Sequence, residues 1–170
     1  MAHAIGRRGI ETAVRLGVAA IVHSGFADSA TVADMKRRRL YLISTLWSLT
    51  GRGASPEATA LGRHMAGVLA AGVPVAMGTD AGVVPHGRNA RELTWLVKSG
   101  LTPLQALRAA TTGAARLLGL ADSIGSVAPG RYADLIAVEG NPLDDVGRLE
   151  RVGFVMRAGK VYRNDFSPPH

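Results

Sequence analysis

The sequence predicts an α/β protein built around a parallel β-sheet. Short apolar runs of strand length alternate with helical patterns from the N-terminus to about Leu120. These runs are apolar at nearly every position, as expected of strands that helices cover on both faces. Apolar residues make up 47% of the chain and aromatic residues only 5%, which indicates a core of small aliphatic side chains in a layered α/β fold.

The first elements follow this alternation. Residues 1–3 have the sequence of a strand end, and residues 9–16 carry the apolar stripe of a helix. A strand over residues 18–22 ends at His23. The next helix is expected to begin after Asp28, whose carboxylate is a suitable N-cap, and a further strand follows it over residues 40–43.

The next elements repeat the unit. Ser55 and Pro56 have the cap and first-turn residue types of a longer helix, which is expected to close near Gly72. The apolar run over residues 73–77 is the strand that follows, and it leads directly into Asp80 through a Gly-Thr pair. After it we expect helices over residues 89–98, 102–110 and 113–118.

The pattern changes after Asp122, where helical periodicity stops and short β-like runs separated by glycine turns begin. The expected strands cover residues 124–127, 135–138, 152–157 and 161–162. The last two form a hairpin through the turn at residues 158–160. Residues 165–170, with two prolines, are expected to be a frayed terminus.

Composition and charge narrow the function classes. The chain has no cysteine, so neither disulfides nor thiolate metal ligands are available. Residues 65–77 are the longest uncharged apolar stretch, which is shorter than the ~20 residues of a membrane span. No signal-peptide pattern precedes them, so a cytoplasmic location without membrane contact is expected.

The net charge of +7 raises nucleic-acid binding as an alternative. The densest basic run covers residues 36–39, follows a helical pattern and has no interleaved aromatic residues. We therefore interpret it as a solvated helix end, where cations also favour the helix dipole, and expect no nucleic-acid partner.

Three polar residues occupy equivalent places on different strands. His3, His23 and Asp80 each stand at the C-terminal end of an apolar strand, with a glycine close behind. That edge of a parallel sheet is where ligands and catalytic groups gather. Two imidazoles and a carboxylate suit a divalent metal ion such as Zn²⁺. The alternative is that each is an isolated polar residue satisfied by a loop backbone group.

These residues lie in segments that resemble the metal-dependent amidohydrolases, in particular the imidazolonepropionase-like and Xaa-Pro dipeptidase-like group. Residues 2–6 and 17–25 are similar to the family's fifth and sixth barrel strands, each with a ligand histidine, although Val22 and Ser24 replace the usual Glu and Gly. Residues 78–82, Gly-Thr-Asp-Ala-Gly, match the eighth-strand motif. Similar motifs also cover residues 85–87, 90–93, 100–107, 124–135, 141–143 and 159–162.

The resemblance implies a fold and a domain organisation. Residues 1–120 would form the C-terminal half of a (β/α)8 TIM-like barrel, with strands five to eight and their helices. Residues 121–164 would form a portion of a small β-sandwich, and residues 165–170 a flexible tail. Asp134, which resembles a family position in the sandwich, is interpreted as structural. His64, on a helix away from any strand end, is interpreted as structural or solvated.

The resemblance also implies a chemistry. His3, His23 and Asp80 would hold a divalent metal, first of all zinc, and Asp80 would also shuttle a proton. The reaction would be hydrolysis of a C–N bond in a small amide, dipeptide or cyclic amide. His86 could line the substrate pocket, although a histidine exposed on a loop is equally compatible with its position.

One part of the family pattern is missing. Members carry an HxH pair on the first strand, and this chain has no such pair. A full barrel takes about 250 residues, so we expect a C-terminal fragment that is inactive alone. The alternatives are a non-catalytic domain and a half-barrel completed by a partner, either a homo-oligomer or a complementary half, because open strand edges favour association.

Overall fold

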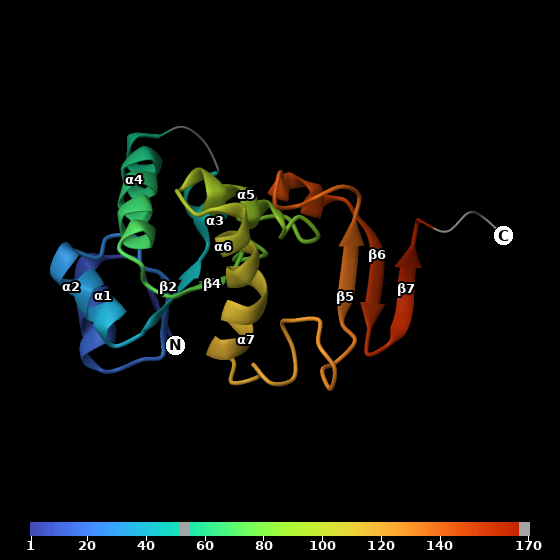
Figure 1. Cartoon of the computed structure of the whole chain (residues 1–170). Coiled ribbons are helices and arrows are strands. Elements are labelled where there is room, and N and C mark those ends of the chain that lie inside the picture. The colour runs from blue at the N-terminus through green and yellow to red at the C-terminus, as the bar shows by residue number, and fades with distance from the viewer. Residues whose placement is uncertain (52–54, 167–170) are drawn as a thin grey trace.

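The computed structural model describes residues 1–51 and 55–166, and these residues contain two β-sheets. The first sheet is four-stranded in the order β1-β2-β3-β4, and the second is three-stranded in the order β5-β6-β7. Figure 1 shows the two sheets toward opposite ends of the molecule, with helices α5, α6 and α7 between them. The predicted α/β class is confirmed for the first section of the chain.

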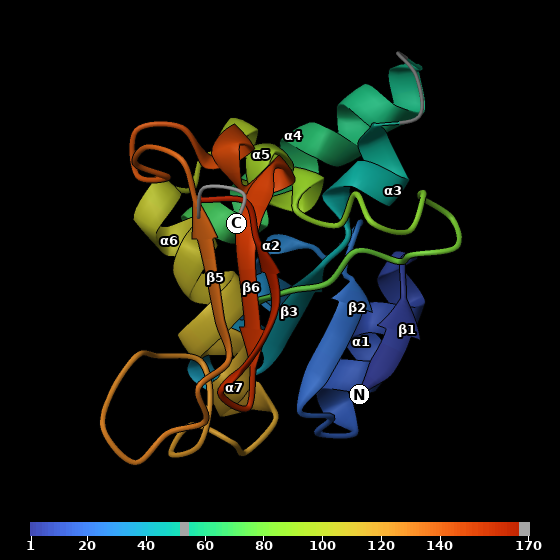
Figure 2. The ribbon, with the colours of Figure 1, turned by 90° about the vertical axis from the view of Figure 1, so that its right-hand side faces the viewer.

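The first sheet is parallel throughout. Its strands are β1 (Ala2–Ala4), β2 (Ala20–His23), β3 (Tyr41–Ser44) and β4 (Val75–Met77). In the register, Ala4 pairs with His23, Ile21 with Leu42, and Ile43 with Ala76. The arrows of β1 and β2 point to the same end of the sheet in Figure 2. The C-terminal ends of the strands, with the residues that follow them, therefore meet at one edge.

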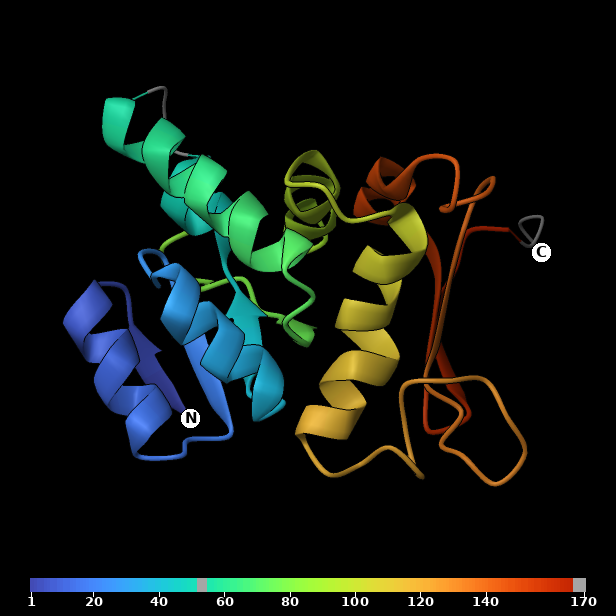
Figure 3. The ribbon, with the colours of Figure 1, turned by 60° about the vertical axis from the view of Figure 1, so that its left-hand side comes forward.

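Helices connect these strands where the sequence predicts them. They are α1 (Arg7–Arg15), α2 (Ser29–Arg37), α3 (Leu46–Thr50) and α4 (Pro56–Ala70). The Asp28 carboxylate accepts the Thr31 N–H, and the Ser55 hydroxyl accepts the Ala58 N–H, so both predicted N-caps are confirmed. Figure 3 shows α1 and α2 over the same face of the sheet. Of these four helices, α3 alone has no counterpart among the predicted elements.

The helices after β4 differ from the prediction in one respect. They are α5 (Arg91–Lys98), α6 (Pro103–Arg108) and α7 (Ala114–Leu117), and a π-helical turn over Ala109–Gly113 joins α6 to α7. Two separate helices were expected here. The segment stays helical because Gly113 lets it pass close to β4: a Cβ at this position would lie 2.9 Å from the carbonyl oxygen of Val75.

One buried cluster runs from the parallel sheet into the C-terminal section. Its fully buried members include Ile10, Ile21, Met35, Leu42, Met65 and Leu96. Val146 and Leu149, from a short 3₁₀ helix over Val146–Glu150, belong to the same cluster as Leu93 of α5. The C-terminal section therefore packs against the α/β section through this 3₁₀ helix.

The second sheet is antiparallel and consists of β5 (Leu135–Val138), β6 (Val152–Arg157) and β7 (Lys160–Asn164). The predicted hairpin is confirmed: Ala158 and Gly159 form its turn with φ values of 49° and 78°. The Asp134 carboxylate accepts the Ala158 N–H at 2.7 Å, which agrees with a structural role for Asp134.

The expected strand over residues 124–127 is wrong, because residues 124–126 form bends and residue 127 has no regular structure. Gly125 has a φ of 87°, and the Arg131 guanidinium donates to the Ile124 carbonyl at 3.2 Å. The Ile124 carbonyl therefore accepts a hydrogen bond from a side chain instead of from the backbone N–H of a neighbouring strand.

Of the expected terminal tail, residues 167–170 lie outside the described residues. Among the helices that the structure describes, none has the length and apolar character needed to cross a membrane.

Candidate functional site

The structure brings His3 and His23 together. His3 lies in β1 and is exposed, whereas His23 ends β2 and is only 3% exposed. His23 Nε2 lies 3.0 Å from His3 Nδ1, and the rings meet edge to face with centroids 4.5 Å apart. Neighbouring parallel strands place these residues one register position apart, so the contact follows from the alternation of strands and helices.

The second ring nitrogen of His23 has its own partner. His23 Nδ1 lies 2.5 Å from the hydroxyl oxygen of Thr45, a buried residue directly after β3. A proton on Nδ1 that is donated to this hydroxyl leaves the Nε2 lone pair directed toward His3. Histidines that bind metals are usually held in this way, by a hydrogen bond from the nitrogen that does not bind the metal.

The surroundings of His23 favour its neutral form. Burial lowers the pKa of His23 below its ordinary value of 6.5, and the neighbouring His3 acts in the same direction. The Asp80 carboxylate raises the pKa of His23, so it lies within electrostatic reach of the imidazole. A neutral imidazole is the form that binds a metal ion.

The backbone is strained at the ends of β2 and β4. His23, Ser24 and Asp80 have φ values of 80°, 50° and 56°, in the left-handed region that residues other than glycine rarely adopt. Such conformations cost about 1–3 kcal/mol each and cluster at functional sites. Two of the three predicted metal ligands are therefore held in conformations that the surrounding structure must stabilise.

Two contacts hold the turn that carries Asp80. The Asn89 side-chain amide donates to the Thr79 hydroxyl at 3.0 Å, and the Gly78 N–H donates to the Ser44 carbonyl at 2.9 Å. A Cβ at Gly78 would lie 2.6 Å from a methyl carbon of Ile43, so only glycine allows this approach to β3. Asp80 itself is exposed at the tip.

Glu92 is a buried polar residue whose role the sequence did not reveal. It lies in α5, has no exposed surface, and accepts the N–H groups of Leu46 at 2.7 Å and Trp47 at 2.9 Å. Burial raises the pKa of Glu92 to about 7, although both backbone donors oppose this effect. The sequence does contain one indication that Glu92 is buried: its helical spacing to Leu96 places it on the apolar face of the helix.

The donors at this edge fit part of a metal site. His3 and His23 present facing imidazole nitrogens, and His23 has the Thr45 hydroxyl as its outer partner. Within residues 1–51 and 55–166, however, no three His, Cys, Asp or Glu side chains gather closely enough to hold a metal ion. Asp80 as third ligand, and exposed His86 as a pocket residue, therefore stay predictions.

Other polar residues singled out by the sequence have local structural contacts. His64 Nε2 bonds to the carbonyl oxygen of Ala27, in agreement with a structural histidine. In the basic run, Lys36 and Arg37 lie in the last turn of α2, and Arg37 and Arg38 pair with Asp34. A helix end accounts for this run locally.

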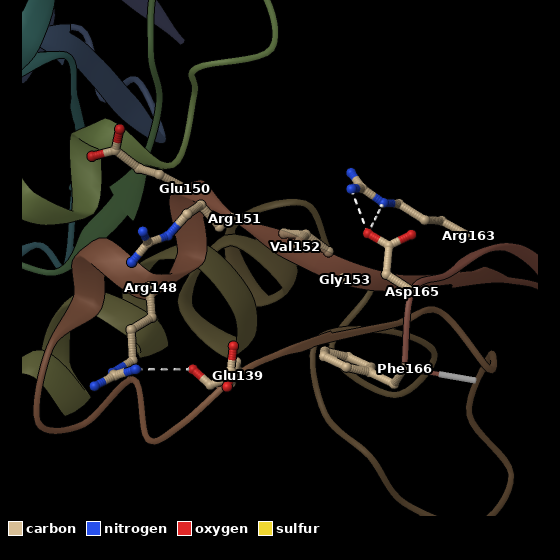
Figure 4. Close-up of a pocket in the computed structure, with 9 residues that line it drawn as sticks. All are labelled: Glu139, Arg148, Glu150, Arg151, Val152, Gly153, Arg163, Asp165 and Phe166. Carbon is tan, nitrogen blue, oxygen red and sulfur yellow. Dashed lines mark hydrogen bonds and ion pairs between the residues drawn. The ribbon is translucent and has the colours of Figure 1, made fainter. Parts of the chain in front are cut away.

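A hollow of about 680 Å³ lies at the antiparallel sheet, and Figure 4 shows the residues that line it. Arg163 there pairs with Asp165, and Arg148 donates to the Glu139 carbonyl at 3.3 Å, although the buried Arg148 Nε has no hydrogen-bond partner among the described residues. None of His3, His23 and Asp80 lines this hollow, so it is separate from the candidate site.

Comparison with known proteins gives consistent matches. The model of the amidohydrolase family matches residues 3–162. The ochratoxinase of Aspergillus niger is 32% identical over 181 residues, which cover 95% of this chain and 37% of that protein. The imidazolonepropionase of Shouchella clausii is 33% identical over 102 residues, which cover 55% of this chain and 22% of that protein.

Solved structures agree with these matches. The crystal structure of a Xaa-Pro dipeptidase with methionine bound in its active site superposes with a TM-score of 0.88 at 32% identity, covering 96% of this chain and 44% of that one. The crystal structure of the A. niger ochratoxinase superposes with a TM-score of 0.83 at 29% identity, covering 96% of this chain and 41% of that one. The chain thus spans less than half the length of these relatives.

Proposed function

We propose that this chain, which belongs to the amidohydrolase family, carries part of the active site of a metal-dependent hydrolase that acts on C–N bonds. The observation that carries the proposal is the contact between His3 and His23 at the ends of neighbouring parallel strands. The substrate would be a small amide, a dipeptide or a cyclic amide. The names of the dipeptidase and imidazolonepropionase relatives support this range.

The proposal includes an architecture. Residues 1–120 would be the C-terminal half of a (β/α)8 barrel, residues 121–164 a portion of a β-sandwich, and residues 165–170 a tail. Four consecutive parallel strands with intervening helices support the first part, and the antiparallel sheet supports the second. The structural neighbours, of which this chain covers less than half, support the view that further strands complete the barrel.

His3, His23 and Asp80 would hold the metal ion, and zinc suits this set because it contains imidazole and carboxylate but no thiolate. When bound, such an ion supplies a water molecule with a pKa near 7 and polarises the carbonyl under attack. The Thr45 hydroxyl would keep the His23 ring in the required orientation. Low exposure of His23 would keep it neutral.

Asp80 would move the proton of the reaction. Its carboxylate would accept one proton from the attacking water and deliver it to the leaving nitrogen, acting first as a base and then as an acid. Asp80 is exposed after β4, which would give its carboxylate access to both groups. Asn89 would hold its turn through Thr79. His86 on the following loop would line the substrate pocket.

Metal binding and hydrolysis by the 170-residue chain test this proposal. We expect zinc affinity to fall in His3→Ala and His23→Ala, and to stay unchanged in His64→Gln, a matched control that keeps a side-chain donor for Ala27. Hydrolysis of N-acyl amino acids and dipeptides is expected to be weak or absent. Strong turnover that survives His3→Ala and Asp80→Ala would refute the site.

The open sheet supports a second candidate, a half-barrel completed by a partner. Among the described residues, neither β1 nor β4 is hydrogen-bonded to a strand on its outer side. Unpaired strand edges favour association with another chain, either a second copy or a complementary half. Light scattering of the purified chain distinguishes a monomer from an oligomer, and an oligomer that hydrolyses amides would favour this candidate.

A further inference from the structure

We propose that Glu92 is a positioning residue of this site, which fixes the first turn of α3 so that the Thr45 hydroxyl meets His23. This inference rests on the proposed metal site at His3 and His23. It connects the last residue of β2, His23, with the segments that follow β3 and β4. The Glu92 carboxylate bonds to the first turn of α3 and not to His3 or His23, so its effect would pass through Thr45.

The capping arrangement at α3 is the first observation. Thr45 occupies the N-cap position, where threonine normally accepts an N–H of the first turn through its hydroxyl. Thr45 makes no such bond, and its hydroxyl lies 2.5 Å from His23 Nδ1. The Glu92 carboxylate accepts the Leu46 and Trp47 N–H groups instead. Glu92 thus performs the capping, which leaves the Thr45 hydroxyl free for His23.

The packing around Glu92 is the second observation. It is fully buried in α5, next to Leu93 and one turn before Leu96, both of which are buried in the core. The Arg91 guanidinium also lies over the Trp47 ring, 5.4 Å from its centroid. Two neighbouring residues of α5 therefore hold the first turn of α3, and a shift of that turn would move Thr45 relative to His23.

The energetic cost of burying Glu92 argues against the view that this residue only caps α3. Burying a carboxylate is costly, and the raised pKa of Glu92 reflects that cost. A threonine at an N-cap could satisfy one of the same donors without a buried charge. The arrangement gains one thing that Thr45 capping would not provide, namely a hydroxyl that can hydrogen-bond Nδ1 of His23 and so orient the imidazole ring.

Nitrogen-15 NMR of the histidine rings in the full chain tests the proposal without metal. In the wild type we expect His23 to carry its proton on Nδ1. Glu92→Gln retains one acceptor and loses the other, so the Leu46 and Trp47 amides should exchange faster and His23 should shift toward the Nε2–H tautomer. Thr45→Val should shift His23 in the same direction. Asp145→Ala removes a carboxylate that accepts the Gly147 N–H, and should leave His23 unchanged.

Unchanged His23 signals in folded Glu92→Gln would overturn the positioning role. If that variant fails to fold, Glu92→Asp is measured by the same criterion, because it keeps the charge and shortens the reach by one methylene. Zinc titration separates the two proposals, with an affinity loss of about 10-fold to 100-fold expected in Glu92→Gln. If the wild-type chain binds no zinc, the metal site is refuted. If the His23 signals still shift in Glu92→Gln, the positioning role is supported all the same.

Discussion

Replacing Glu92 with Gln should remove a pH dependence of stability that this buried carboxylate creates. Burial raises the pKa of Glu92 from its ordinary value of 4.5 to about 7, against the opposing backbone donors Trp47 and Leu46. Between these two values the folded chain keeps a proton on Glu92 that the unfolded chain has released. The free energy of unfolding should therefore fall as the pH rises through this window.

The expected size of the effect follows from the two pKa values. Their difference corresponds to a loss of about 3 kcal/mol of unfolding free energy between the low-pH and high-pH ends of the window. His23 acts in the opposite direction, because its lowered pKa makes its contribution to stability disappear as the pH falls below 6.5. The two effects must therefore be separated experimentally.

The assay compares two chains that both carry His23→Asn, with and without Glu92→Gln. Asparagine removes the imidazole and tolerates the positive φ at position 23. Urea unfolding followed by the fluorescence of Trp47 and Trp95 gives the free energy of unfolding at each pH. We expect the difference between the chains to change by about 3 kcal/mol from pH ~4.5 to ~7.5. A constant difference, or one that changes in the opposite direction, would refute the reasoning.

Two further predictions concern the turn after β4. Gly78→Ala places a Cβ 2.6 Å from Ile43 and 2.8 Å from the Ser44 carbonyl, so thermal unfolding should show that the free energy of unfolding falls by about 1–3 kcal/mol. The control is Gly67→Ala in α4, where a Cβ meets no atom within 4 Å and the change should be neutral or stabilising. Equal melting temperatures for these two variants would contradict the close approach at Gly78. Asp80→Asn should abolish any metal-dependent hydrolysis while changing the free energy of unfolding by no more than about 0.5 kcal/mol, since asparagine tolerates the φ of 56°. An active Asp80→Asn variant would exclude Asp80 as the proton carrier.

Much of the fold was predictable from local patterns. Apolar strand runs and helical stripes located the four parallel strands and most of their helices, because burial imposes these periodicities on the sequence itself. The caps at Asp28 and Ser55 were predictable because a capping side chain acts within its own turn. The neighbouring positions of His3 and His23 followed from consecutive parallel strands.

Other local predictions failed where groups outside the segment decided the outcome. Residues 124–127 have the composition of a strand, but the Arg131 side chain bonds to this segment, and no strand in the described part of the chain pairs with it. The break expected between the helices at residues 102–110 and 113–118 is replaced by a π-helical turn, because Gly113 packs against the backbone of β4. Neither partner can be recognised within the segment itself.

By itself, the sequence determined the α/β class, the order of the first elements and the strand-end positions of His3, His23 and Asp80. Only the tertiary structure decided that Thr45 meets His23 and that Glu92, 46 residues after Leu46, caps α3. The physical reason is the separation along the chain over which these interactions act. Periodicity and capping act within a few residues, whereas a buried carboxylate finds its donors only after β3, β4 and α5 have packed.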